Sequence, residues 1–245
     1  MNSGLYAACA GLVAQTQALD LAANNLANLN TTAYKGQVPT FRSLLASDEN
    51  SLAAANPIAQ AVNDFAVLAG SRTDLLQGSL EKTGSDFDFA VQGDGWFAVE
   101  TASGRLYTRN GNFHVDSSGR LATAEGYPVS GAQGPLTIPP GKLSVSDDGT
   151  ISVDGALAGE LKLVSFAPGT VLTPAGNASF SAPAGSELKA QGTIVQGSLE
   201  GSNVNGISAA VGLVALQRHA DLLQQALTAF HSNFNRIAAQ DLSRI

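Results

Sequence analysis

The chain has 245 residues, of which 44% are hydrophobic and only 13% are charged, and this composition predicts a folded chain rather than a disordered one. The formal net charge is −7, and the excess of acidic residues is concentrated in the middle of the chain. Residues 43–205 hold 17 of the 20 acidic and 8 of the 13 basic residues. The chain therefore has no basic stripe, and we expect no binding to nucleic acid.

The N-terminal stretch from Gly4 to about Asn28 predicts a helix with one apolar seam. Leucines recur every seven residues, as in the a/d positions of a heptad repeat. These leucines are Leu5, Leu12, Leu19 and Leu26. The segment before Gly11 lacks the basic region of a signal peptide, and no run in the chain reaches the length of a membrane span. We therefore expect neither a cleaved signal nor direct membrane insertion.

Three asparagines lie near the end of this predicted helix, at Asn24, Asn25 and Asn28. Asparagine is a poor helix former, so three within five positions require a reason. They are either solvated residues near a helix end or amides that bond across an interface to neighbouring backbones. We favour the second interpretation.

The middle of the chain changes character twice. Residues 35–72 have few charges and predict a linker or an extended arm. Residues 73–205 contain short alternating runs separated by Gly and Asp turns, which predict an antiparallel β domain of many short strands. The sequence Gln-Gly-Ser-Leu-Glu occurs at 77–81 and again at 196–200, and paired strands at the entrance and exit of the domain would explain this repeat.

Residues 206–245 predict a second helix with a narrow apolar stripe. The stripe keeps a three-four rhythm over about three and a half heptads. Its members are Leu213, Leu216, Ala220, Leu223, Leu227, Phe230, Phe234 and Ile237. Such a stripe is typical of a helix that packs on another helix.

The expected fold class is therefore α+β, with N- and C-terminal helices paired as a coiled coil and a central antiparallel all-β domain. Residues 1–34 with 206–245 form the expected assembly module. The alternative is that each end packs on its own globular core.

The sequence contains no recognisable catalytic motif. It has neither a nucleophile elbow nor a His-Glu-x-x-His pair, and its single cysteine excludes a cysteine-based metal cluster. We therefore expect no enzyme activity, no cofactor and no metal. Asp86 with Asp88, or Asp147 with Asp148, leaves open a carbohydrate-active or carbohydrate-binding β protein with a coiled-coil stalk.

Several segments resemble the flagellar rod and hook proteins. Residues 19–35 (LDLAANNLANLNTTAYK) closely resemble the N-terminal signature of that family, and residues 83–99, 107–119 and 196–205 are similar to its later motifs. The resemblance implies a structural subunit of the bacterial flagellar basal-body rod. It also implies export through the flagellar export apparatus, and assembly with copies of itself and with other rod and hook subunits. Terminal helices from many copies would build an inner tube, with the β domain outside.

Within the family, the opening Leu5-Tyr6 and the chain length favour a proximal-rod member, with a distal-rod or hook subunit as the alternative. Ala33 replaces a glycine usual in the family and Ala220 replaces an aromatic residue. If position 33 needs a positive φ, alanine there costs about 1 kcal/mol. The expected assembly interface comprises Leu5, Leu12, Leu19, Asn24, Asn25, Leu26, Asn28, Leu213, Leu216, Leu223, Leu227, Phe230, Phe234 and Ile237.

Overall fold

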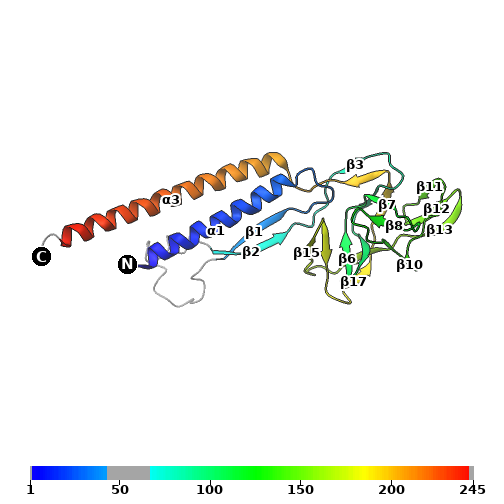
Figure 1. The fold of residues 1–245 in the computed structure, drawn as a ribbon, viewed down its shortest axis with the longest axis horizontal. Helices are drawn as coiled ribbons and strands as arrows, with labels where there is room; N and C mark the ends of the chain where they lie inside the picture. Colours follow the sequence, from blue (N-terminus) through cyan, green and yellow to red (C-terminus); the bar gives the residue numbers. More distant parts are fainter. Residues whose placement is uncertain (1, 43–66, 243–245) are drawn as a thin grey trace. The chain divides into compact units, whose positions relative to one another are not determined.

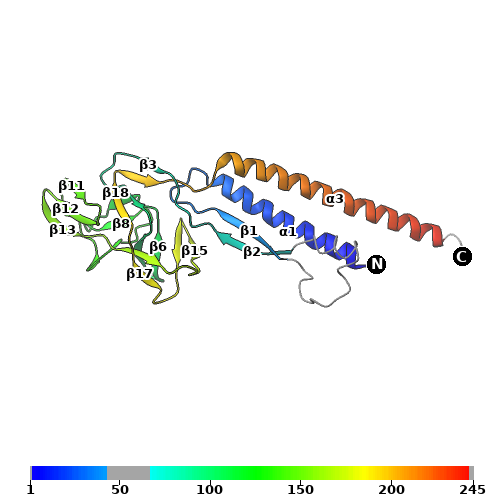
Figure 2. The same cartoon turned by 180° about the vertical axis from the view of Figure 1, so that it is seen from behind.

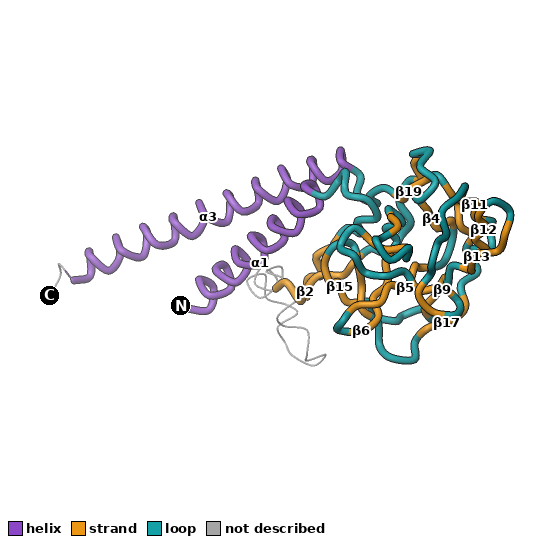
Figure 3. The backbone as a smooth tube through the Cα atoms, turned by 45° about the vertical axis from the view of Figure 1, so that its right-hand side comes forward, coloured by secondary structure: helices purple, strands orange, loops and turns teal. Residues whose placement is uncertain are grey.

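The computed structural model describes the backbone of residues 2–42 and 67–242, and the side chains of residues 9–40, 70–229 and 232. The chain divides into two compact units. A helical unit comprises Met1–Leu29, Gly36–Asp74 and Val204–Ile245, and a β unit comprises Asn30–Lys35 and Leu75–Asn203. Helices lie at both ends of the chain and the middle is strand-rich and antiparallel, as the sequence predicted (Figures 1 and 3).

The helical unit is built on two helices, α1 (Asn2–Ala27) and α3 (Gly206–Leu242), which lie alongside each other (Figures 1 and 2). The Gln15 amide donates a hydrogen bond to the carbonyl oxygen of Leu216 at 3.1 Å. The Leu29 side chain lies against Gly206, where a Cβ would come within 2.8 Å of it. Since Gln15 precedes Leu29 while Leu216 follows Gly206, the two helices run antiparallel.

Local chemistry fixes where α3 begins. Asn205 occupies the N-cap, and its side-chain oxygen accepts a hydrogen bond from the backbone N–H of Ser208 at 3.0 Å. This satisfies one of the backbone donors that a helix start leaves without a partner. No proline interrupts the 37 residues that follow, so the helix continues to Leu242.

Two strands, β1 (Gln37–Arg42) and β2 (Val67–Thr73), pair antiparallel beside α1 (Figure 2). Their register runs from Gln37 opposite Thr73 to Arg42 opposite Val67, with an irregularity between Thr40 and Phe41. The sequence predicted a linker or arm over 35–72, and this pairing was missed because β1 contains Pro39 and has no clear alternation. The intervening residues 43–66 lie outside the described part of the chain.

The β unit consists of short strands joined by tight turns. The strands are β3 (Leu80–Lys82), β4 (Phe89–Gln92), β5 (Trp96–Thr101), β6 (Gly104–Thr108), β7 (Phe113–Val115), β8 (Leu121–Thr123), β9 (Ser130–Gly131), β10 (Gly134–Pro135), β11 (Leu143–Val145), β12 (Thr150–Val153), β13 (Ala156–Glu160), β14 (Leu163–Phe166), β15 (Thr173–Gly176), β16 (Ser179–Ser181), β17 (Glu187–Lys189), β18 (Thr193–Gln196) and β19 (Ser198–Glu200). The largest sheet has the order β15-β16-β6-β5-β14-β17, and β11-β12-β13 form a second sheet. The remaining strands pair as β3–β19, β4–β18, β7–β8 and β9–β10.

Two apolar clusters fill the β unit. The larger one surrounds Phe89, Phe97 and Phe113, where the rings of Phe97 and Phe113 meet edge to face with centroids 5.2 Å apart. The smaller one surrounds Trp96 and Phe180. β5 contributes to both clusters, because Trp96 and Phe97 point to opposite faces of the sheet.

The pairing of β3 with β19 confirms the prediction made from the repeated pentapeptide. Leu80 lies opposite Glu200 and Lys82 lies opposite Ser198. The two glycines of the repeat meet different needs. A Cβ on Gly78 would collide with the carbonyl oxygen of Gly201, whereas Gly197 has a φ of 70°.

Candidate assembly site

The predicted seam of α3 is the more buried side of that helix. Leu213, Leu216, Ala220, Leu223 and Leu227 are all half-buried, whereas nearly all of the positions between them are exposed. Among the described side chains, this pattern puts the seam on the side of α1. Phe230, Phe234 and Ile237 belong to α3, but their side chains lie outside the described residues.

On α1 the deepest burial falls on small residues rather than on leucines. Leu12, Leu19 and Leu26 are half-buried, whereas Ala14 and Ala18 are 3% and 0% exposed. The reason is that α3 and the β1–β2 pair both contact α1, so a strip of α1 is covered from two sides. The sequence analysis missed these alanines, although their spacing of four residues was visible. The side chain of Leu5 lies outside the described residues.

The asparagines of the N-terminal signature bond to backbone within the chain. The Asn25 amide donates to the carbonyl oxygen of Gln37 at 2.8 Å and accepts from the Gln37 N–H at 2.9 Å. It therefore occupies the place of a further strand beside β1. Asn28 donates to the carbonyl and side-chain oxygens of Asn24, at 2.9 and 3.2 Å. The Asn25 amide thus does bond to a neighbouring backbone, but within the same chain, and the expected contact across an interface stays a prediction.

A second apolar stripe covers the side of α3 that faces away from the seam, and the sequence analysis did not recognise it. Large side chains on this side are exposed to solvent by about half or more. They are Ile207 (79%), Val211 (66%), Val214 (49%) and Leu222 (61%). Exposed apolar surface of this kind is typical of a protein–protein contact.

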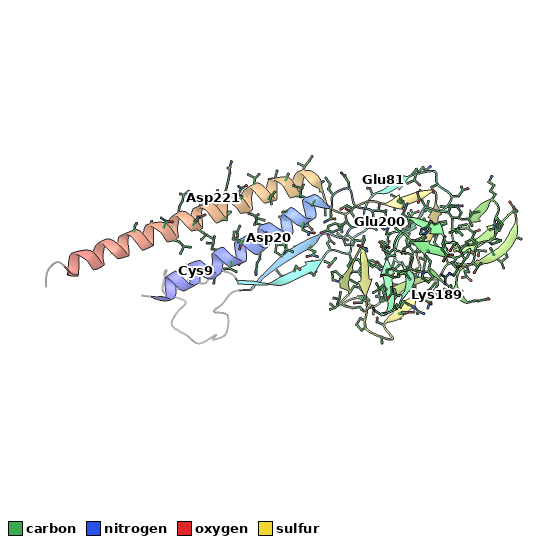
Figure 4. All side chains as sticks on the ribbon, in the orientation of Figure 1. Cys9, Asp20, Glu81, Lys189, Glu200 and Asp221 are labelled. Atoms are coloured by element: carbon green, nitrogen blue, oxygen red, sulfur yellow. The ribbon has the colours of Figure 1, made fainter. Side chains whose placement is uncertain are left out.

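The β unit encloses a charged cluster centred on Glu200, whose side chain is fully buried. Lys35 donates to Glu200 Oε1 at 2.5 Å and to the carbonyl oxygen of Leu76 at 2.6 Å. The Gly78 N–H donates to the same carboxylate oxygen at 3.0 Å. A buried carboxylate requires such partners, because leaving it unpaired would cost several kcal/mol. Figure 4 shows Glu200 beside the exposed Glu81, its counterpart in the repeat.

Arg109 completes this cluster. Its Nη1 lies 3.4 Å from Glu200 Oε2, and its Nη2 donates to the carbonyl oxygen of Gly93 at 2.9 Å. Its guanidinium carbon also lies 5.2 Å from the centre of the Trp96 ring, a cation–π contact. Burial lowers the pKa of Arg109, and the carboxylates of Glu200 and Asp94 oppose that shift.

Ala33, in the signature segment, has a φ of 56° and is fully buried. Its N–H donates to the carbonyl oxygen of Glu200 at 2.7 Å. Position 33 therefore requires the left-handed conformation that glycine adopts without cost, as the family resemblance suggested. Ala33 and Lys35 both bind Glu200, so this part of the N-terminal signature completes the β unit.

A second charged cluster lies on the largest sheet. Glu187 accepts hydrogen bonds from Arg105 at 2.8 Å, Tyr107 at 2.6 Å and Lys162 at 3.0 Å. Burial by itself raises the pKa of Glu187. The hydrogen bonds from these three residues outweigh this effect and lower the pKa to about 2. Two main effects raise the pKa of Tyr107 to about 12. Burial is the larger, and the hydrogen bond to Glu187 is the second.

Among the side chains that the structure describes, no three His, Cys, Asp or Glu residues are grouped so that they could hold a metal ion. Neither α1 nor the described length of α3 contains a stretch apolar enough to cross a membrane.

Terminal helices that bracket a strand-rich unit, with one apolar helix face left exposed, are the features of a subunit that assembles with other chains. Comparison with known proteins identifies the kind of subunit. Residues 5–35 match the family model "Flagella basal body rod protein", and residues 90–153 match "Flagellar hook protein FlgE/F/G D1 domain".

Relatives match over most of the chain. It is 32% identical to the flagellar basal-body rod protein FlgF of Mesorhizobium japonicum, with 89% of each chain covered. It is 30% identical to FlgF of Escherichia coli, covering 96% of this chain and 97% of the relative. The chain is 31% identical to FlgG of Agrobacterium fabrum, and the match covers 91% of this chain and 94% of the relative. The chain therefore belongs to the family of flagellar basal-body rod proteins, which is a structural family and not a class of enzymes.

Proposed function

We propose that this chain is a subunit of the flagellar basal-body rod and that it polymerises through its terminal helices. The observation that supports this most directly is the two-sided character of α3. One side packs toward α1, and the opposite side exposes four large apolar residues. A helix that is apolar on two sides suits a bundle in which it touches a further chain as well as its own partner.

Within one subunit, we propose that α1 and α3 pair through their leucine seams as a coiled coil. The half-buried seam positions on both helices and the antiparallel contacts support this pairing. All the positions predicted as interface residues are proposed to act here, including those whose side chains lie outside the described residues. Asn25 and Asn28 act indirectly, by holding the end of α1 and the β1–β2 pair in place.

We further propose a place in the proximal rod, because FlgF proteins are among the relatives that match nearly the whole chain. A distal-rod role is the alternative, since FlgG proteins match almost as well. Contact with other rod and hook subunits, passage through the flagellar export apparatus and a position in the periplasm-spanning rod belong to the same proposal and rest on family membership.

The seam can be tested with single charges. Leu216→Asp and Leu12→Asp each place a carboxylate at a half-buried seam position, where its desolvation costs on the order of 2 kcal/mol or more. We expect either variant to be missing from purified basal bodies and to abolish swimming in soft agar. Near-ultraviolet circular dichroism from Trp96 should remain native, because Trp96 lies in the β unit.

The matched control is Gln217→Asp, which adds the same charge next to Leu216 at an exposed position. It should assemble normally. Normal rods containing Leu216→Asp would refute assembly through the seam. Loss of assembly with Gln217→Asp as well would show that any added charge on α3 is harmful.

A further inference from the structure

The outward side of α1, which faces away from its buried strip, contains one isolated charge. Asp20 is the only charged residue in α1, and it is exposed without an ion pair to any described residue. Cys9 and Val13 share this side, because they precede Asp20 by eleven and seven residues, close to whole numbers of helical turns. Both are exposed. Figure 4 marks Cys9 and Asp20 on α1.

The outward side of α3 contains one isolated charge of the opposite sign. Arg218 lies seven residues after Val211 and four after Val214, within the exposed apolar stripe. It is exposed and has no ion pair among the described residues. The nearest acidic residue on α3, Asp221, makes no ion pair with it in the described structure. Exposed polar side chains flank both charges, Thr16, Gln17 and Asn24 on α1 and Asp221 and Gln225 on α3, so each helix presents a mixed apolar and polar surface with an unpaired charge near its centre.

The charges are not partners within one chain: they make no ion pair in the described structure, and Arg218 lies on the side of α3 away from the seam. They are complementary between chains. Copies that repeat in one direction along a fibre have parallel α1 helices, so α1 of one copy runs antiparallel to α3 of the next, as it does within a copy. Contact between two different surfaces of identical chains repeats without closing on a pair, as polymerisation requires.

We infer that the outward side of α1 in one copy packs antiparallel on the outward side of α3 in a second copy, with Asp20 paired with Arg218. This inference rests on the proposed function and specifies which surfaces join neighbouring subunits. The pair sets the register between copies, since a charge left opposite an apolar side chain would lose its solvation without compensation.

A charge exchange tests the pair in cells that make the variant as their only copy of the protein. Asp20→Arg places two cations together and Arg218→Asp places two carboxylates together. Each should lower the amount of subunit in purified basal bodies by at least about tenfold, as expected for like charges in a contact. The double variant restores the attraction and should recover most of that amount. Glu125→Arg reverses an exposed charge of the β unit and is the control.

The native cysteine offers a second measurement. Antiparallel pairing of Asp20 with Arg218 brings Cys9, eleven residues before Asp20, opposite Ala229, eleven residues after Arg218. Ala229→Cys should therefore yield disulfide-linked dimers and longer ladders upon mild oxidation of assembled rods. Ala226→Cys adds a thiol at an exposed position on another side of α3 and should give few of them. The unsubstituted chain shows how much Cys9 links to itself.

The outcomes separate this inference from the proposed function. If Leu216→Asp blocks assembly but the charge exchange fails to rescue, the rod role stands and the Asp20–Arg218 contact is wrong. Cross-links from Ala226→Cys equal to those from Ala229→Cys, or cross-links to a different rod protein only, would also overturn it. If Leu216→Asp leaves assembly intact, the proposed function itself fails.

Discussion

At the scale of single residues, Ala33 adopts a strained backbone conformation within the N-terminal signature segment. Its φ of 56° lies in the left-handed region, which an L-residue other than glycine enters at a cost of about 1 kcal/mol. The position is fixed because its N–H binds Glu200 and its side chain is fully buried.

Ala33→Gly should therefore change the stability of the β unit by less than about 1 kcal/mol. The relief of backbone strain, about 1 kcal/mol, is offset by the loss of one buried methyl group, about 0.8 kcal/mol, and by the added freedom of the unfolded chain. The urea midpoint followed by Trp96 fluorescence measures this. Ala23→Gly, an exposed position inside α1, relieves no strain and should lower helix stability by up to about 1 kcal/mol. A loss of several kcal/mol in Ala33→Gly would show that packing outweighs strain at this position.

The Glu187 cluster predicts a pH dependence at two ends of the scale. The pKa of Glu187 is about 2 in the folded chain, below its ordinary 4.5, so its contribution is complete above pH 4.5 and is lost as the pH falls toward 2. The pKa of Tyr107 is about 12, above its ordinary 10, so its contribution is lost as the pH rises from 10 to 12.

Glu187→Gln should flatten the acid limb of stability. Urea midpoints measured between pH 5 and pH 2.5 should fall less steeply for this variant than for the parent chain, because one carboxylate no longer takes up a proton on unfolding. An equal slope in both proteins would rule out this cluster as a source of acid sensitivity. Exposed Glu125→Gln should leave the slope unchanged.

At the scale of elements, the Asn25 amide joins a helix to a strand. Two of its hydrogen bonds go to the backbone of Gln37, so a side chain contributes to holding β1 on that side. Asn25→Asp keeps the side-chain oxygen that accepts from the Gln37 N–H. It replaces the amide nitrogen with an anionic oxygen that faces the Gln37 carbonyl oxygen. We expect faster hydrogen exchange at the Gln37 amide and its neighbours in β1, with a loss of about 1–3 kcal/mol.

Gln17→Glu provides a control for that change, since it adds a carboxylate on the same helix at an exposed position. It should leave exchange in β1 unaltered. Unchanged exchange at Gln37 in Asn25→Asp would mean that β2 alone holds β1.

At this scale, features encoded by a pattern within one segment could be predicted, whereas contacts between residues far apart in sequence could not. The two helices follow from apolar spacing within single segments, and the β3–β19 pair follows from a repeated pentapeptide. The buried charge cluster could not be foreseen, because Lys35, Arg109 and Glu200 are far apart in sequence and each resembles an ordinary surface charge. The β1–β2 pair was missed because β1 contains a proline and shows no clear alternation of apolar and polar residues.

The outward apolar stripe of α3 was missed for a different reason. Its residues are mixed with Arg218 and Gln225, so the helix reads as amphipathic with one apolar side. Only the exposure of Ile207 and Val211 in the folded chain shows that a second side is also apolar.

At the scale of the whole molecule, the β unit is discontinuous in sequence. It takes Asn30–Lys35 from before the β1–β2 pair and the rest from Leu75 onward. A fragment that begins at residue 36 therefore loses Lys35 and leaves Glu200 buried with one cation fewer. We expect residues 36–203 to be less stable than residues 30–203 by about 3–5 kcal/mol, as when one partner of a buried pair is removed.

Denaturation of the two fragments, followed through Trp96, measures this difference. Lys35→Met in the full chain should destabilise the β unit in the same direction, because it removes the charge and keeps the length of the side chain. Equal stability of the two fragments would show that Arg109 alone can neutralise Glu200.

The contact between Lys35 and Glu200 also determines when the β unit can complete its fold while the chain emerges from its amino end. Lys35 is made early, and its counter-charge appears 165 residues later, after every strand up to β19 has been synthesised. The pairing of α1 likewise waits for the final segment of the chain. A polypeptide that emerges amino end first, from a ribosome or a narrow conduit, must therefore leave almost completely before either unit can close.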